Sequence, residues 1–207
     1  MLKLPFFNRK NYILLKCYTK VHTIAHYSPI VLSAKTESEV VKNNPNHALK
    51  RCYGHILGLK NSITIRSWSE FTVSVTEETA NYTFPEDNPS DVKFHNDEDS
   101  PAKDAMVSKL ISPWVISTES DCKFVMASHM LNATGMIIPS GIVNYNTQHQ
   151  TNIFNYVRKV PHTYTVPFKT PLVMIYPISD KKIQLEVYQD LPTYDALVAK
   201  GSYRPYL

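Results

Sequence analysis

The chain contains little glycine and little cysteine, and both shortages restrict its function. Five of the 207 residues are glycine, and neither a Gly-x-Ser-x-Gly elbow nor a glycine-rich phosphate loop is present. This excludes serine-hydrolase chemistry of that type. It also argues against a doubly wound nucleotide-binding fold, which needs more glycine and clear helices between its strands. The three cysteines, Cys17, Cys52 and Cys122, lie far apart, so their spacing offers neither a zinc knuckle nor a disulfide framework.

Long apolar runs and a strong charge asymmetry are also missing. The apolar residues within Met1–Lys10 form a stretch that is too short for a signal peptide or a membrane span. The formal net charge is +4, and the basic residues are scattered along the chain rather than gathered into one stripe. We therefore expect no nucleic-acid partner and no membrane partner.

The sequence does contain a series of segments in which apolar and polar residues alternate. A period of two places one face of a strand on a core and the other face in water. The clearest segments span residues 63–68, 71–75, 122–126, 151–157, 172–176 and 182–187. With fourteen prolines and thirteen tyrosines, they predict a single all-β domain over residues 1–207. Its expected architecture is a jelly-roll-like antiparallel β-sandwich with one or two short helices.

Two short helices and one polar region interrupt the predicted strands. One helix is predicted from Asn46 to Tyr53, and a second from Pro192 to Lys200, ending at the glycine that follows. Residues 85–105 are rich in acidic, amide and proline residues. This composition is typical of an exposed loop region around one short edge strand.

The stretch from Gly141 to Tyr156 is the most unusual one, because amides, a histidine and aromatic residues crowd between two apolar runs. If residues 142–147 and 151–157 pair as strands, the histidine lies at or near their connection. Amide side chains there would hydrogen-bond to the backbone, and we favour this structural role over ligand binding. The candidate binding residues of this stretch are Asn144, Tyr145, Gln148, His149 and Asn152.

Trp68 and Trp114 complete the set of candidate binding residues, and each lies at the boundary of a predicted strand. Burial in the core is the default expectation for tryptophan. A place on a binding surface is the functional alternative, because tryptophan is enriched at protein interfaces.

A metal site is a further possibility that the residue types leave open. His95 and Asp97 form a His-x-Asp pair, and His129, His149 or His162 could supply a remote histidine, with His149 as our choice. Two imidazoles and one carboxylate are the ligands of non-haem iron in jelly-roll oxygenases. The acidic run that follows His95 is nevertheless explained by a solvated loop tip. The main interpretation therefore expects no cofactor, and the alternative expects iron.

Five motifs spread over most of the chain carry a resemblance to a known family. They are Met1–Phe7, Ser67–Ser69, Leu110–Trp114, Ile138–Asn152 and Thr170–Ile183. Together they resemble an uncharacterised protein family of marine tailed phages, chiefly myoviruses. The resemblance implies a viral context and supplies no catalytic residues, and the stretch between 75 and 108 departs most from the pattern.

These observations favour a non-enzymatic structural or accessory protein of a tailed-phage virion that acts through protein–protein contacts. Its expected partners are other virion proteins, with self-association as an additional option. Its expected location is the virion, after synthesis in the host cytoplasm. Two alternatives stay open: a phage-encoded jelly-roll oxygenase of the non-haem iron, 2-oxoglutarate type, and a binding protein directed at a host target.

Overall fold

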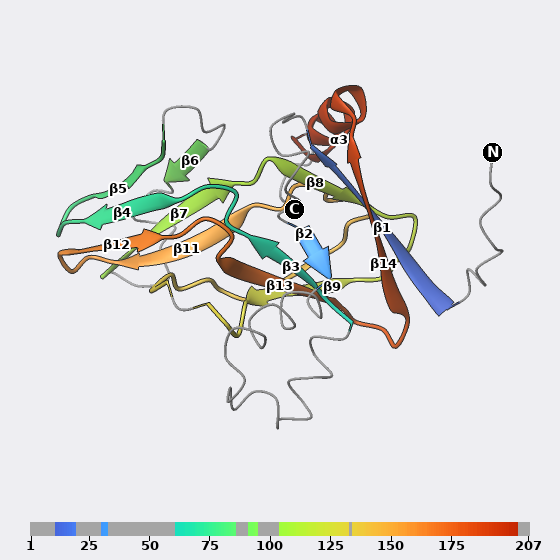
Figure 1. The fold of residues 1–207 in the computed structure, drawn as a ribbon, viewed down its shortest axis with the longest axis horizontal. Coiled ribbons are helices and arrows are strands. Elements are labelled where there is room, and N and C mark those ends of the chain that lie inside the picture. Colours follow the sequence, from blue (N-terminus) through green and yellow to red (C-terminus); the bar gives the residue numbers. More distant parts are fainter. Residues whose placement is uncertain are drawn as a thin grey trace.

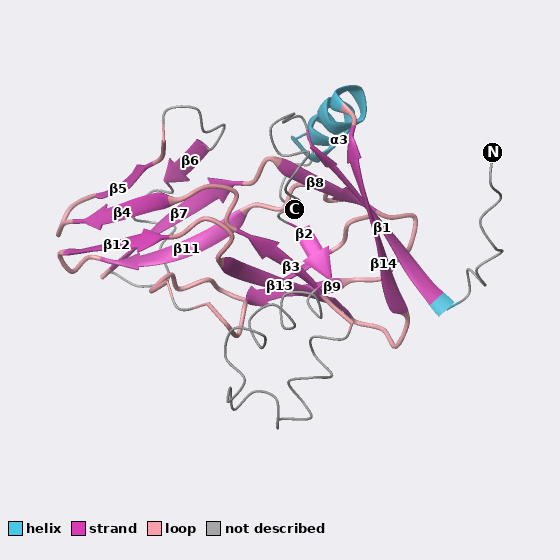
Figure 2. Ribbon diagram, in the orientation of Figure 1, coloured by secondary structure: helices cyan, strands magenta, loops and turns pink. Residues whose placement is uncertain are grey.

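Figure 1 shows the computed structural model of the chain, in which strands dominate and α3 (Leu191–Ser202) follows the last strand. The structure describes residues 11–19, 30–32, 61–85, 91–94, 104–132 and 134–202. Coloured by secondary structure, these residues are mainly strands joined by short loops (Figure 2), which confirms the predicted all-β class. No helix within the described ranges is long and apolar enough to cross a membrane.

The described strands form four sheets, each named here by its strands in spatial order. The β14–β1–β8 sheet contains β14 (Lys182–Gln189), β1 (Tyr12–Thr19) and β8 (Trp114–Ser117). The β10–β9–β13–β3–β2 sheet contains β10 (Gly141–Val143), β9 (Phe124–Ser128), β13 (Pro171–Pro177), β3 (Ile63–Arg66) and β2 (Ile30–Leu32). The β11–β7–β6 sheet contains β11 (Ile153–Arg158), β7 (Ala105–Ile111) and β6 (Asp91–Phe94). The β12–β4–β5 sheet contains β12 (His162–Val166), β4 (Phe71–Val75) and β5 (Ala80–Thr83).

Ser67 joins two of these sheets at a corner, where β3 leads into β4 and β12 leads into β13. Its N–H donates to the carbonyl of Thr170 at 2.8 Å, and its Oγ donates to the carbonyl of Pro167 at 2.6 Å. The Thr170 N–H donates back to Ser67 Oγ at 2.9 Å. The antiparallel β3–β13 and β4–β12 pairs therefore follow one another across the corner, with the turn's polar groups satisfied.

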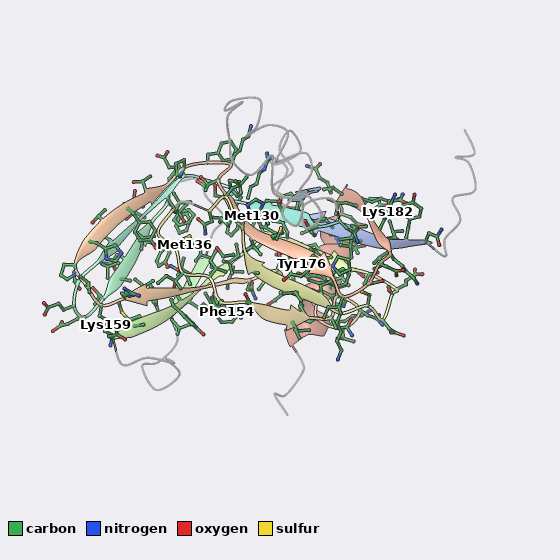
Figure 3. All side chains as sticks on the ribbon, turned by 90° about the horizontal axis from the view of Figure 1, so that it is seen from below. Met130, Met136, Phe154, Lys159, Tyr176 and Lys182 are labelled. Carbon is green, nitrogen blue, oxygen red and sulfur yellow. The ribbon has the colours of Figure 1, made fainter. Side chains whose placement is uncertain are left out.

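The β12–β4–β5 and β11–β7–β6 sheets face each other across a shared core, and Met136 lies between them (Figure 3). This packing is consistent with a β-sandwich. Among the described strands the pairs are antiparallel except β1 and β14, which pair in parallel from Tyr12↔Lys182 to Thr19↔Gln189. The jelly-roll winding stays a prediction.

Alternation along β1 shows how the sequence sets the core. Ile13, Leu15 and Cys17 are buried, whereas the residues between them are partly exposed. Burial raises the pKa of the Cys17 thiol, which keeps it protonated and unreactive. These side chains belong to one continuous cluster of buried residues that draws on all four sheets.

Helix α3 begins at a capping aspartate. The Asp190 carboxylate accepts the Thr193 N–H at 3.1 Å and the Thr193 hydroxyl at 2.7 Å, and these bonds lower the pKa of Asp190. Tyr194 and Leu197 pack on Val115 of β8. The helix confirms the prediction for the C-terminal region but does not end before Gly201, because glycine permits a helix end without forcing one.

Other predicted elements have mixed outcomes. The helix predicted from Asn46 to Tyr53 lies outside the described residues. Within the predicted loop region of 85–105, β6 forms a short strand at the edge of its sheet, as expected. The pairing of residues 142–147 with 151–157 is wrong, because β10 pairs with β9 and β11 pairs with β7.

Candidate functional site

The candidate stretch begins with a tight turn built by Asn144. Its Oδ1 accepts the Asn146 N–H at 3.0 Å, and its carbonyl accepts the Gln148 N–H at 2.7 Å. The Asn146 amide donates to Asp121 Oδ1 at 3.0 Å, which ties the turn to the preceding loop. The Asn144 side-chain oxygen therefore accepts a hydrogen bond from the backbone, while the Gln148 side chain is exposed.

His149 is held against β8 through both its backbone and its ring. The Ile116 N–H donates to the His149 carbonyl at 2.8 Å, and His149 Nδ1 lies 3.1 Å from the Ile116 carbonyl. Next to it, Gln150 forms an isolated antiparallel bridge with Val115 of β8. Because a carbonyl oxygen can only accept, the contact between Nδ1 and the Ile116 carbonyl is a hydrogen bond in the tautomer that carries a proton on Nδ1. This contact explains why the segment after the turn follows β8 instead of forming a hairpin.

At the end of the stretch, the Thr151 side chain bonds to residues at and just before the start of β8. Thr151 Oγ1 lies 3.0 Å from the Trp114 carbonyl and 2.9 Å from Ser112 Oγ. The Asn152 amide donates to Gln150 Oε1 at 2.9 Å, and its buried Oδ1 has no partner among the described residues. These contacts fix the stretch against the strand boundary at Trp114.

Tyr145 lies in the interior although its sequence neighbours are polar. Its ring is fully buried and packs against Phe124, with centroids 5.3 Å apart. The hydroxyl has no partner among the described residues. Burial, and next the charge that Cys17 would carry, raises the pKa of Tyr145. Tyr145 therefore supports the turn from below and presents no surface to a ligand.

Both tryptophans lie in the core. Trp68 is 7% exposed in the turn between β3 and β4, and Trp114 is 1% exposed at the start of β8. This placement agrees with the default expectation for tryptophan. It leaves almost no indole surface for a partner.

Only one of the three residues of the iron alternative lies within the described structure. His95 and Asp97 lie outside the described residues, and the His149 ring faces the Ile116 carbonyl. Among the residues that the structure describes, no group of three or more histidine, cysteine or acidic side chains is placed to hold a metal ion. The iron alternative is thus left with the sequence pattern alone.

A buried polar network between two sheets was not predicted from the sequence. Asn155 Nδ2 donates to the hydroxyls of Tyr82 at 2.8 Å and Tyr164 at 3.3 Å, and Asn155 Oδ1 accepts the Ile137 N–H at 3.0 Å. Tyr82 OH lies 2.5 Å from Ser108 Oγ, which donates to the Asn155 carbonyl at 3.3 Å. The network therefore links β5, β7, β11 and β12 through one fully buried amide.

The raised pKa values of its two tyrosines keep this network intact near neutral pH. Burial, and next the nearby Tyr82, raises the pKa of Tyr164 to about 12. Burial likewise raises the pKa of Tyr82. Both hydroxyls therefore stay protonated, and each can donate one hydrogen bond and accept from Asn155. The signal in the sequence was an amide at a core position of an alternating strand, between Ile153 and Val157.

A second feature missed from the sequence is the exposed edge formed by β14. Val187 and Tyr188 are 42% and 40% exposed, although both are large apolar residues. Tyr188 stacks on Tyr18 of β1, with centroids 5.3 Å apart. A side-chain hydrogen bond with Glu186, and next burial, raises the pKa of Tyr188 to about 12. This aromatic pair stays neutral at physiological pH.

Comparison with known proteins gives no assignment for these features. A scan against models of known protein families finds no match, and a search of curated protein sequences finds none either.

Proposed function

We propose that this chain is a non-enzymatic structural or accessory protein of a tailed-phage virion, acting through contacts with other virion proteins. The observation that carries the proposal is the edge of β14. This eight-residue strand pairs with β1 along one side, and no described strand lies along its second side. An open edge of this kind can accept a strand from another protein.

The second half of β14 is the part of this edge that is available for such pairing. At the start of β14, Asn61 Oδ1 accepts the Ile183 N–H at 2.9 Å, and Asn61 Nδ2 donates to the Lys181 carbonyl at 2.7 Å. The Asn61 side chain therefore already bonds the Lys181 carbonyl and the Ile183 N–H, and neither group is available to an added strand. Val187 and Tyr188 lie beyond it, with their side chains exposed, so the second half of β14 supports strand addition.

The viral context of the proposal comes from the resemblance to the family of marine tailed phages. Under this proposal the chain is made in the host cytoplasm and located in the virion. Its ligands are proteins, including further copies of itself, rather than nucleic acid or membrane. The role requires no cofactor.

Quantitative mass spectrometry of gradient-purified particles tests this proposal, using a phage that encodes the chain. We expect the protein at a fixed copy number per particle, because a component held by specific contacts is incorporated stoichiometrically. The same preparation from infected-cell lysate provides the control for expression. A protein that is abundant in the lysate but missing from the particles would contradict the virion role.

A further inference from the structure

The outer face of the β11–β7–β6 sheet gathers basic and aromatic side chains that are distant in sequence. Lys93 of β6 lies opposite Lys109 of β7, and Lys109 lies opposite Phe154 of β11. Tyr156 and Arg158 follow Phe154 on the same face of β11, because residues two apart on a strand point the same way. We call Lys93, Lys109, Phe154, Tyr156 and Arg158 the basic face.

The two lysines of the basic face repel each other. Directly opposite residues on antiparallel strands have neighbouring side chains, and like charges there are destabilising. Partial burial, and next the charge of Lys93, lowers the pKa of Lys109, whereas a carboxylate at position 93 would raise it. The Lys109 Nζ lies 5.7 Å from the centroid of the Phe154 ring, which holds it in place. The sheet would be more stable with an acid at position 93.

Apolar side chains border these charges. Ile137 forms an isolated bridge with Tyr156 and is 44% exposed, and Ile111 of β7 is partly exposed. A surface that mixes cations with partly exposed apolar groups suits a protein segment that carries both carboxylates and apolar side chains. Base stacking is less favoured, because it needs an open ring face and Lys109 already lies over Phe154.

We propose that the basic face binds an acidic segment of a partner protein, with Lys93, Lys109 and Arg158 facing its carboxylates. This inference rests on the proposed function, since it names the chemistry of one protein partner. Carboxylates placed between Lys93 and Lys109 would replace repulsion by attraction. The partner's apolar side chains would cover Ile111 and Ile137. Phe154, the residue of the basic face that carries a label in Figure 3, marks its place on the molecule.

Fluorescence anisotropy with the full-length protein tests the proposal in solution. The probes are a labelled peptide of alternating glutamate and leucine and a labelled oligothymidylate of equal length. We expect the peptide to bind wild type and to bind Lys93→Glu and Lys109→Gln at least about tenfold more weakly. Lys123→Glu is the matched control, because Lys123 is exposed and lies outside both the basic face and β14. It should bind the peptide as wild type does, and added salt should weaken binding to wild type.

Thermal unfolding of the same proteins separates lost binding from lost folding. Lys93→Glu should shift the unfolding midpoint upward, because it replaces a like-charged cross-strand pair by an opposite-charged one. A Lys93→Glu protein that is more stable than wild type but binds the peptide more weakly would support the proposal that the two lysines bind a partner. A Lys93→Glu protein that binds the peptide as tightly as wild type would overturn the proposal.

Two further outcomes separate this inference from the proposed function. Tighter binding of the oligothymidylate, lost in the same variants, would overturn the acidic-protein partner in favour of nucleic acid. If wild type is present in particles but binds no acidic peptide, the inference fails while the virion role stands. If it binds the peptide through Lys93 and Lys109 but is missing from particles, the basic face stands and the virion role fails.

Discussion

Replacing Asn155 by alanine should lower the free energy of unfolding by about 3 kcal/mol, since each buried polar group left without a partner costs about 1–3 kcal/mol. The substitution removes the donor to Tyr82 and Tyr164 and the acceptor for the Ile137 N–H. The two hydroxyl oxygens lose a donor but keep their own protons to donate, whereas the Ile137 N–H loses its acceptor. Urea unfolding followed by tryptophan fluorescence measures this change, because Trp68 and Trp114 are both buried.

Asn146→Ala is the control for the Asn155 substitution. Asn146 is exposed and its amide bonds to Asp121, so its loss should change the free energy of unfolding by less than about 0.5 kcal/mol. If Asn155→Ala were as stable as Asn146→Ala, the network between the two sheets would contribute nothing. The positioning of β11 would then need another explanation.

Truncating Phe124 to alanine should cost about 3–5 kcal/mol, the range measured for buried Phe→Ala changes. Phe124 of β9 is fully buried, and its ring packs against Tyr145 beneath the Asn144 turn. The cavity left behind would cost contacts on both sides, because interiors are close-packed. Urea unfolding gives the change in free energy, and near-ultraviolet circular dichroism reports whether the environment of Tyr145 loosens.

Ile142→Ala is the matched control for Phe124→Ala. Ile142 lies on β10, which pairs with β9, but its side chain is 68% exposed. Its truncation should change the free energy of unfolding by less than about 0.5 kcal/mol, as is usual for surface sites. Equal effects of the two substitutions would contradict the placement of Phe124 in the core.

The strands could be predicted where burial is one-sided. In β4, Phe71, Val73 and Val75 are buried and the residues between them are partly exposed, so the pattern was visible in the sequence. The same holds for β11, with Ile153, Asn155 and Val157 facing inward. Alternation depends on one strand at a time, and it can be recognised without knowing the neighbouring strand.

Pairing could not be predicted in the same way, because it depends on distant residues. Residues 142–147 and 151–157 looked like a hairpin, yet the bonds between His149 and Ile116 direct the chain along β8. Tyr145 was a candidate binding residue and lies in the core, because apolar contact with Phe124 outweighs its polar surroundings in sequence.

The position of the charged residues also depends on strand pairing, and the basic face is an example. The basic residues are scattered along the sequence, and only the register between β6 and β7 brings Lys93 and Lys109 together. Composition reports how many cations a chain has, whereas the pairing of strands decides where they gather. The role of Asn155 was hidden for a similar reason, since its partners come from β5, β12 and the segment before β10.

The central claim is that this protein works through direct contacts with other proteins, and carbodiimide cross-linking of intact purified particles tests it most directly. This reagent joins a lysine amine to a carboxylate that is in contact with it. We predict cross-links from Lys93 or Lys109 to aspartate or glutamate residues of a different virion protein. Cross-links confined to other lysines, such as Lys182, would move the contact away from the basic face. Particles in which no lysine of this chain is joined to another protein would contradict the account.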